Sequence, residues 1–288
     1  MIVEAPAKVN LTLEVTGVEE NGYHTLDTLF AWLELHDTLE LSQAETSTLE
    51  VRSDGVSTEL VTDDESNLVM RALRCLEQSC ARALPTRLVL TKRIPTGGGL
   101  GGGSADAAAA LIGLRRLHGL AMDDLELHRL AARLGADVAF GLLGGFARGR
   151  RYGDELESLA LPEDLKEREM VLLAPGFPCP TPEVYKSWDR QPGHKARGAS
   201  SRFLESSANK RLQQVSNDLQ PAAESLFPQL RVLREQMLQT GLEGVCLSGS
   251  GSTLFGFVPR EGSATLVEKR LLGLGKVMLT KLKEDGRG

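Results

Sequence analysis

Six glycines surround a single leucine in the stretch between Pro95 and Asp106, and this stretch is the part of the sequence best suited to chemistry. Glycine costs backbone entropy and adds no side chain to packing, so such a cluster indicates that another group approaches the backbone closely. A predicted helix over 105–117 follows at once, with Ser104 placed to cap it. Backbone N–H groups and the positive end of a helix dipole favour phosphate. The stretch therefore predicts a phosphate-binding loop rather than a flexible linker.

Two common phosphate-binding motifs fit the spacing but not the context. Gly97 and Gly102 have the spacing of a P-loop, but Gly103 stands where that motif needs a lysine. Gly97, Gly99 and Gly102 also have the spacing of a dinucleotide-binding loop. That motif needs a strand ending in an acidic residue about 20 positions further on, and here the acidic residues begin a predicted helix. The glycine stretch therefore contains no lysine of its own.

Composition narrows the class of protein that surrounds this loop. The chain has 288 residues, 41% of them hydrophobic, which predicts one large or two modest domains with a buried core. The formal net charge is −6 and no basic tract stands out, which argues against nucleic acid as a partner. The four cysteines form no C-x-x-C pair and the five histidines are scattered, so we expect reduced thiols, no zinc site and a cytoplasmic protein. We find no signal peptide and no long apolar span, so we expect no membrane partner.

Hydrophobic periodicity predicts the elements that position the loop. Alternation over Ile2 to Val15 predicts a strand on which Lys8 and Asn10 share one face. Further on we expect strands over 28–35, 38–42, 49–52 and 86–93, and helices over 68–83, 105–117 and 125–134. The second half predicts a connector or hairpin over 146–167, then a ferredoxin-like order of strand 169–174, helix 182–188, strands 244–247 and 253–258, helix 262–274 and strand 276–282. Further helices are expected at Pro221 and Pro228, and a mobile surface loop over 191–207.

Three separated motifs resemble those of the GHMP kinases. They are Ala5-Pro6-Ala7-Lys8-Val9-Asn10-Leu11, the glycine stretch from Pro95 to Ala105, and the Gly/Ser turn before Thr253-Leu254-Phe255-Gly256. The doubled triple glycine is most similar to that of the diphosphocytidyl-methylerythritol kinases. The resemblance implies a two-domain α+β architecture. It consists of a ribosomal-protein-domain-2-like α/β domain over 1–150 with the ATP-binding loop, and a ferredoxin-like domain over 151–288.

The resemblance also implies a reaction and its catalytic residues. The γ-phosphoryl of ATP, with Mg²⁺, would move to the 2-hydroxyl of a cytidyl-linked methylerythritol in isoprenoid precursor synthesis. Asp137 alone would be interpreted as a helix N-cap, but Leu134-Gly135-Ala136-Asp137-Val138 resembles the segment that carries the family's proposed catalytic aspartate. Lys8 would keep Asp137 ionised and favour charge on the transferred group. The family continues with Pro-Phe-Phe, whereas this chain has Ala139-Phe140-Gly141 and so departs at the first and third positions. These departures weaken helix entry and apolar packing more than they affect the carboxylate. No carboxylate ligand for Mg²⁺ stands out, which leaves Ser104 as the candidate.

The remaining site residues are also implied by the resemblance. In the family, the aromatic ring of a Gly-Tyr-His segment stacks on the cytosine and its histidine hydrogen-bonds to the base. The predicted nucleotide-binding residues are Pro95, Thr96, Gly97, Gly98, Gly99, Leu100, Gly101, Gly102, Gly103, Ser104 and Ala105. The predicted substrate-binding residues are Asn10, Tyr23, His24, Asp137, Thr181 and Tyr185, and the third motif supplies Ser248, Gly249, Ser250, Gly251 and Ser252.

Three other functions compete with this interpretation. The chain could be another GHMP kinase, acting on homoserine or a mevalonate derivative, against which the segment Gly22-Tyr23-His24 argues. It could be a catalytically inactive nucleotide-binding protein, against which the presence of both Lys8 and Asp137 argues. Fold resemblance alone would also allow a nucleic-acid-handling protein, which the acidic balance disfavours. The expected partner is a small molecule, a cytidine diphosphate derivative, and the expected state is a monomer or a weak homodimer.

Overall fold

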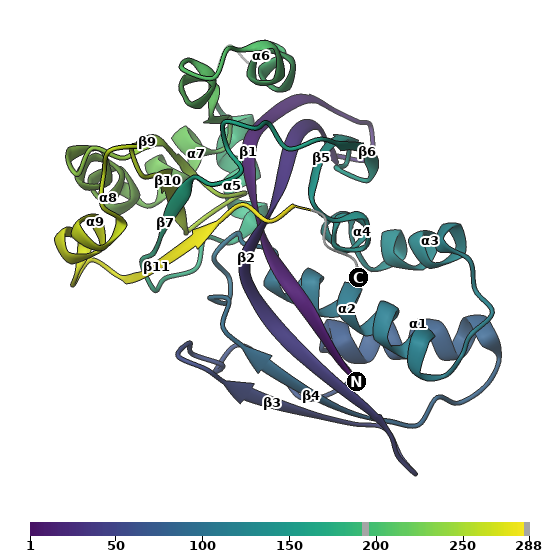
Figure 1. Ribbon diagram of the computed structural model, residues 1–288. Helices are drawn as coiled ribbons and strands as arrows, with labels where there is room; N and C mark the ends of the chain where they lie inside the picture. Colours follow the sequence, from purple (N-terminus) through teal and green to yellow (C-terminus); the bar gives the residue numbers. More distant parts are fainter. Residues whose placement is uncertain (192–195, 285–288) are drawn as a thin grey trace. The chain divides into compact units, whose positions relative to one another are not determined.

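The computed structural model describes residues 1–191 and 196–284, which form two compact units. Unit 1 consists of Met1–Ala7, Leu35–Thr96 and Gly101–Gly144, and unit 2 of Lys8–Glu34, Gly97–Leu100 and Gly145–Gly288. Two long strands, β1 (Ile2–Val18) and β2 (His24–Gln43), contribute residues to both units (Figure 1). The glycine stretch is likewise divided between them after Leu100. The domain boundary expected at residue 150 stays a prediction, because a compact unit need not follow the order of the chain.

Unit 1 is a sheet with helices on one face (Figure 1). Strand β4 (Thr86–Lys92) pairs antiparallel with the later part of β2 and parallel with β3 (Thr48–Ser53). The helices are α1 (Leu68–Cys80), α2 (Gly102–Leu117), α3 (Asp124–Leu134) and α4 (Ala136–Leu143). The prediction of separate strands over 28–35 and 38–42 was wrong. Strand β2 continues through both segments, and Asp37, which appears in the sequence to interrupt the apolar pattern, is fully buried within it.

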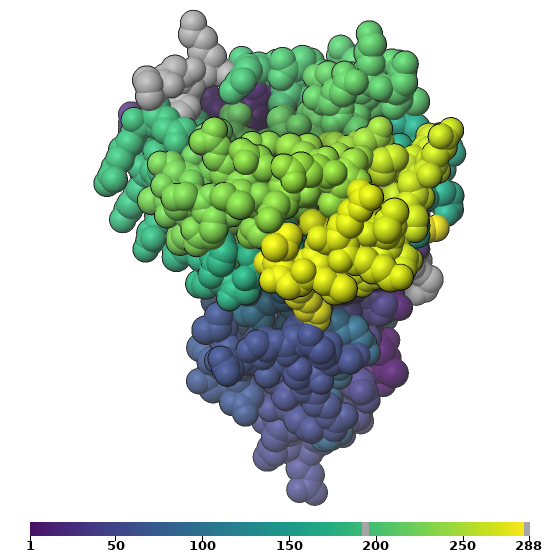
Figure 2. All heavy atoms as spheres, turned by 90° about the vertical axis from the view of Figure 1, so that its left-hand side faces the viewer, coloured from purple at the N-terminus to yellow at the C-terminus, as the bar shows by residue number. Residues whose placement is uncertain are grey.

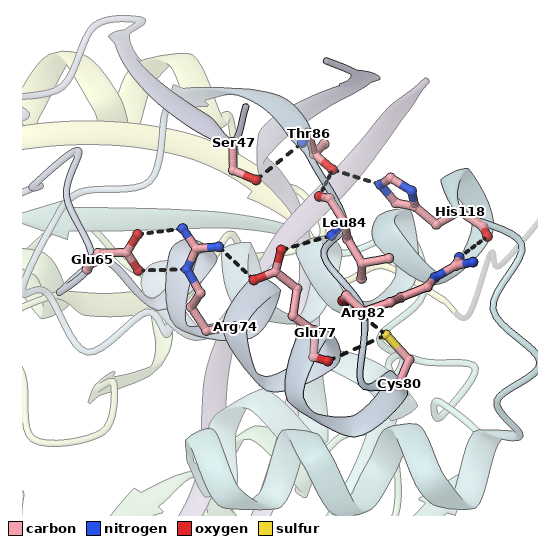
Figure 3. A network of polar contacts seen from close by, with 9 residues as sticks. All are labelled: Ser47, Glu65, Arg74, Glu77, Cys80, Arg82, Leu84, Thr86 and His118. Carbon is pink, nitrogen blue, oxygen red and sulfur yellow. Dashed lines mark hydrogen bonds and ion pairs between the residues drawn. The ribbon is translucent and has the colours of Figure 1, made fainter. Parts of the chain in front are cut away.

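A polar network fixes the start of β4, the strand that leads into the glycine stretch (Figure 3). Arg74 on α1 donates to the carboxylate of Glu77 at 2.6 Å, and that carboxylate accepts the backbone N–H of Leu84 at 2.9 Å. Thr86 is hydrogen-bonded to the ring of His118, just after α2, at 2.8 Å. The start of β4, the strand before the glycine stretch, is therefore fixed to both α1 and the end of α2.

Unit 2 contains the predicted ferredoxin-like arrangement. Its four-stranded antiparallel sheet has the order β11-β7-β10-β9, with α8 and α9 between the strands along the chain. The bounds are β7 (Glu169–Ala174), α7 (Gln220–Leu226), α8 (Pro228–Gln239), β9 (Glu243–Leu247), β10 (Leu254–Phe257), α9 (Ala264–Leu271) and β11 (Lys276–Lys281). Residues of α8 and α9 form much of the outer surface seen in Figure 2. Apolar residues of this sheet and its helices, among them Val171, Leu173, Leu230 and Val267, form one buried cluster.

The other part of unit 2 includes the hairpin that the sequence predicts over 146–167. It is formed by β5 (Phe146–Arg151) and β6 (Glu155–Leu159), and β5 pairs with the early part of β2. The short strand β8 (Ser216–Asn217) runs parallel to β1. Helix α5 (Thr181–Asp189) follows β7, and the 3-10 helix η1 spans Arg211–Gln214.

The mobile loop predicted over 191–207 was wrong for its later part, which contains helix α6 (Ala199–Glu205). The buried carboxylate of Glu14 accepts the backbone N–H groups of Gly198 and Ala199, at 3.0 and 3.1 Å, and so fixes the start of this helix. Sequence periodicity cannot reveal a partner more than 180 residues away. Residues 192–195 of the predicted loop lie outside the described residues.

Two expectations about the class of protein can be checked on the described residues. None of the helices there is both long and apolar enough to cross a membrane. All four cysteines are free thiols, as the sequence predicts. Burial raises the pKa of the Cys179 thiol to about 11 and that of Cys246 to about 12, so both thiols are protonated and poorly reactive at neutral pH.

Candidate active site

The first half of the glycine stretch lies against the third motif, both within unit 2. The Ser248 hydroxyl donates to the carbonyl oxygen of Gly99 at 3.0 Å. The backbone N–H of Thr253 donates to the carbonyl oxygen of Gly98 at 3.1 Å. A Cβ atom added to Gly99 would lie 2.1 Å from the carbonyl oxygen of Ser248, so a side chain at this position has no room. Gly99 also has φ +75°, which glycine adopts without steric cost. Gly98 and Gly99 therefore allow the backbone of the glycine stretch to lie directly against the backbone of the third motif.

Asn217 holds the third motif from its other side. Its side-chain amide donates to the carbonyl oxygens of Leu247 and Gly249, at 2.8 and 2.7 Å, and its oxygen accepts the backbone N–H of Leu219. Thr181, at the start of α5, is hydrogen-bonded to Ser250 at 2.8 Å. The Gly/Ser turn is thus held by buried polar contacts from Asn217 and a partly buried one from Thr181, which explains how a turn without bulky side chains keeps one shape.

Lys8 is a buried residue of β1. Its ammonium group donates to the amide oxygen of Asn10 at 2.8 Å and lies 5.5 Å from the centre of the Phe30 ring. Asn10 in turn donates to Thr28 at 2.8 Å, so the amide oxygen of Asn10 points to Lys8 and its nitrogen to Thr28. The backbone N–H of Lys8 donates to the carbonyl oxygen of Leu100 at 2.9 Å. The strand therefore holds both the lysine and the centre of the glycine stretch.

The second half of the glycine stretch begins helix α2 in unit 1. The N-cap is Gly101, with φ 69°, and no side chain caps the helix. The expected cap, Ser104, was wrong: it lies inside the first turn, because the helix starts two residues earlier, at Gly102. A 16-residue helix whose first N–H groups have no side-chain cap has the features of an anion-binding site.

A cluster of three buried ionisable side chains lies at this helix start. Lys92, the last residue of β4, donates to Asp37 and, at 2.6 Å, to Asp106 on α2. Asp37 also accepts the backbone N–H of Ile94 at 2.9 Å. Burial alone would lower the pKa of Lys92, but the two carboxylates outweigh it and raise that pKa. Burial raises the pKa of Asp106 to about 7 against the opposing charge of Lys92, with Asp37 adding to the rise. The three groups fix the end of β4 to the first turn of α2.

Asp137 lies in unit 1, in the first turn of helix α4, where its side chain is half-buried. The N-cap is Gly135, and the alternative interpretation of Asp137 as a cap is therefore wrong. Helix α4 packs tightly on α2: a Cβ atom added to Gly141 would lie only 2.7 Å from the Cβ atom of Ala108. The departure at Gly141 from the family's apolar pattern thus permits close helix packing. This packing fixes Asp137 relative to the start of α2.

A third group of predicted residues gathers around His24 at the start of β2 in unit 2. The centroid of the His24 ring lies 4.5 Å from the ring centroid of Tyr185 and 5.5 Å from that of Trp188, and both residues are on α5. Tyr23 is 67% exposed, and its ring meets Tyr152 edge to face at 5.7 Å. Because most of Tyr23 is exposed, its ring is accessible for stacking with a flat ring.

Unit 2 therefore brings together Lys8, Asn10 and the third motif, and separately His24 and Tyr185. Sequence reasoning did not single out the residues that hold the site in place. In unit 2 these are Thr28, Asn217 and Asp189, and in unit 1 they are the buried cluster of Asp37, Lys92 and Asp106. Two of them had a signal in the sequence: Asp106 lies at the end of the glycine stretch, and Asn217 begins a segment, Asn217-Asp218-Leu219, that resembles the family's. The others act across long separations in the chain.

No group of three or more His, Cys, Asp or Glu side chains suited to a metal ion occurs among residues 1–191 and 196–284. Ser104 would offer a single hydroxyl, whereas Mg²⁺ prefers six oxygen ligands. The described residues do not form a metal site by themselves.

Comparison with known proteins agrees with this geometry. The model of the GHMP kinases N terminal domain matches residues 67–145, and that of the GHMP kinases C terminal domain matches residues 201–276. Among curated relatives, the 4-diphosphocytidyl-2-C-methyl-D-erythritol kinase of Bacillus velezensis is 33% identical over 275 residues, covering 95% of this chain and 93% of its own length. The enzyme of that name from Paramagnetospirillum magneticum is 38% identical, covering 93% of both.

Solved structures give the same result. A crystal structure of 4-(cytidine 5'-diphospho)-2C-methyl-D-erythritol kinase is 37% identical, with a TM-score of 0.81 over 99% of this chain and 100% of that one. A homoserine kinase from Cytophaga hutchinsonii, 19% identical with a TM-score of 0.74, covers 99% of this chain and 96% of its own and shares the fold. The chain belongs to the GHMP kinases, in the family of the 4-diphosphocytidyl-2-C-methyl-D-erythritol kinases. The expected two-domain α+β GHMP kinase fold is confirmed.

Proposed function

We propose that this protein transfers the γ-phosphoryl group of ATP to the 2-hydroxyl of 4-diphosphocytidyl-2-C-methyl-D-erythritol, in isoprenoid precursor synthesis. The observation that carries the proposal is similarity over nearly the whole chain to kinases of that name, at 33 to 38% identity. The glycine stretch, the buried lysine and the His24 cluster are the parts such a reaction needs. We further propose a cytoplasmic protein that is a monomer or a weak homodimer.

The second half of the glycine stretch is our proposed site for the ATP phosphates. Its uncapped helix start offers backbone N–H groups and the positive end of the α2 dipole. Gly103 is exposed there, and a Cβ atom on it would meet only Leu68, at 3.7 Å. A phosphate can therefore approach the backbone closely at this position. Mg²⁺, expected to bridge the phosphates, stays a prediction.

Asp137 is the proposed base that takes the proton of the attacking hydroxyl. Phosphoryl transfer depends mainly on positioning and on stabilising charge, so a fixed carboxylate is well suited to orienting the nucleophile. The packing of α4 on α2 supplies that fixed position. Lys8 is proposed to stabilise the negative charge of the transferred group. Its hydrogen bond to Asn10, itself held by Thr28, keeps the ammonium group in one place.

The base of the substrate is proposed to lie at Tyr23 and His24, with Thr181 and Tyr185 lining the same pocket. The exposed ring of Tyr23 supports stacking, which is worth roughly 1–3 kcal/mol per base in other proteins. Tyr23→Ala should therefore raise KM for the cytidyl substrate more than KM for ATP.

The test is to follow ADP release with the cytidyl substrate, homoserine and mevalonate side by side. We expect turnover of the cytidyl substrate and little of the other two. A clear preference for homoserine or mevalonate would identify a different GHMP kinase, and ATP binding without turnover of any substrate would indicate an inactive nucleotide-binding protein.

Two variants test the proposed chemistry. Asp137→Asn should lower kcat by ~10²- to 10⁴-fold, the usual contribution of a general base, with the fold intact by circular dichroism. Lys8→Ala should lower kcat far more than it weakens ATP binding. Near-normal turnover of Asp137→Asn, or an effect of Lys8→Ala on ATP affinity alone, would refute the corresponding role.

A further inference from the structure

Asp189 makes the one hydrogen bond that the described part of the chain gives the ring of His24. The Nε2 atom of His24 lies 2.7 Å from a carboxylate oxygen of Asp189, and the His24 side chain is 11% exposed. Tyr185, Trp188 and Asp189 are spaced i, i+3 and i+4 on α5, so they share one face of the helix. All three contact His24. Tyr185 and Trp188 thus pack against the His24 ring, and the Asp189 carboxylate binds one edge of it.

The carboxylate determines which ring nitrogen carries the proton. An ionised carboxylate only accepts hydrogen bonds, so Nε2 of His24 must donate to Asp189. In a neutral imidazole the other nitrogen, Nδ1, is then an acceptor. In its neutral form, His24 therefore has a defined acceptor at Nδ1, on the side of the ring away from Asp189.

We propose that Asp189 is a positioning residue that makes His24 select a cytosine base over a uracil base. The proposal rests on the function above, with the base at Tyr23 and His24. Cytosine presents an exocyclic amine, a donor, at the position where uracil presents a carbonyl oxygen, an acceptor. An acceptor at Nδ1 pairs with the amine and faces the lone pairs of the uracil oxygen. Asp189 thus acts on specificity through His24 and without touching the base.

The first experiment compares Asp189→Asn with the wild type, using the cytidyl substrate and its uridyl counterpart. The introduced amide can donate to Nε2 of His24, which moves the ring proton to Nδ1 and turns the acceptor into a donor. The ratio of kcat/KM for cytidyl over uridyl substrate should fall about tenfold, the effect of roughly one hydrogen bond. Glu183→Gln is the matched control, because it removes the same charge from an exposed position on the same helix. It should leave the ratio unchanged.

A double-mutant cycle separates positioning from a merely structural role. In His24→Asn the introduced side-chain amide stands near the former Nδ1 position but no longer depends on Asp189 for its orientation. Adding Asp189→Asn to this variant should therefore leave its cytidyl-to-uridyl ratio unchanged. If Asp189→Asn lowers kcat/KM for both substrates equally in the wild-type background, or if it changes the ratio as much without His24 as with it, the proposal is overturned.

The failure of this proposal can be told apart from the failure of the proposed function. Wild-type protein that turns over neither nucleotide-linked substrate would refute the function, and this inference with it. Wild-type protein that prefers the cytidyl substrate, with a preference that Asp189→Asn does not alter, would refute only the role of Asp189.

Discussion

The two glycine triplets on either side of Leu100 differ in what surrounds them. In the first, Gly99 has no room for a side chain, because the backbone of the Ser248 turn lies against it. In the second, Gly103 is exposed and a Cβ atom would meet only a distant leucine. The first triplet is fixed by hydrogen bonds that the Ser248 hydroxyl and the Thr253 backbone N–H donate to its carbonyl oxygens. The second is fixed by a helix whose start is held by the buried Lys92 cluster.

This difference separates two reasons for glycine that look identical in the sequence. A glycine that lies against protein backbone serves the fold, and replacing it should damage stability first. A glycine with an exposed N–H group at a helix start has no fold-based reason to lack a side chain, so a ligand is the better explanation.

Lys92→Met should have the largest effect, because it removes the cation between two buried carboxylates. Breaking a buried ion pair by deleting one partner typically costs about 3–5 kcal/mol. We expect a loss of that order in the free energy of unfolding, measured by urea denaturation. The double variant Lys92→Met/Asp106→Asn should recover part of it. If Lys92→Met unfolds like the wild type, the cluster does not hold the second half of the loop.

Gly99→Ala should cost about 3 kcal/mol of stability, since a methyl group would overlap the Ser248 carbonyl oxygen and φ is positive. Gly176→Ala is the matched control, because Gly176 has φ +84° with nothing within 4 Å of an added Cβ atom. It should lose only the smaller backbone term, about 1 kcal/mol. Equal losses in the two variants would show that the contact with the third motif does not matter.

Asp106→Asn should change how stability depends on pH. Burial raises the pKa of Asp106 from 3.8 to about 7, so the folded protein holds a proton there that the unfolded chain has lost. Stability from this group therefore falls as pH rises from about 4 to about 7, and the loss is complete above that range. Relative to the wild type, the variant should gain on the order of 2 kcal/mol between pH 5 and pH 8, measured by thermal or urea unfolding. A difference that does not vary with pH would place the titration elsewhere. Asp54→Asn, at an exposed ion pair, should show no such trend.

The sequence was enough to predict the fold class and many of the elements in both halves, because periodicity and the three motifs are local signals. It predicted β7 and the strands and helix that follow β9 to within a few residues. The sequence-based prediction failed where a residue distant in the chain determines the local structure. Helix α6 depends on Glu14, and β2 continues through Asp37 because Lys92 compensates the buried charge.

The candidate site shows the same limit. The motifs identified Lys8, Asp137 and His24, yet the residues that orient them are separated from them in the chain. Thr28 lies on a different strand from Lys8, and Asp189 is 165 residues from His24. A helix start was also misplaced at Ser104, because propensity disfavours glycine in a helix whereas the loop requires it there.

Gly103→Ala should have the smallest effect on stability and the most informative effect on function. The position is helical and open, so alanine should leave the free energy of unfolding within about 0.5 kcal/mol of the wild type or improve it. If the ATP phosphates lie on the backbone here, the added methyl group should raise KM for ATP about tenfold, equivalent to roughly one lost hydrogen bond. An unchanged KM for ATP would remove the second triplet from the phosphate site. Gly99→Ala, by contrast, should lower stability and activity together, so the pair of variants distinguishes a glycine required by the fold from one required by the ligand.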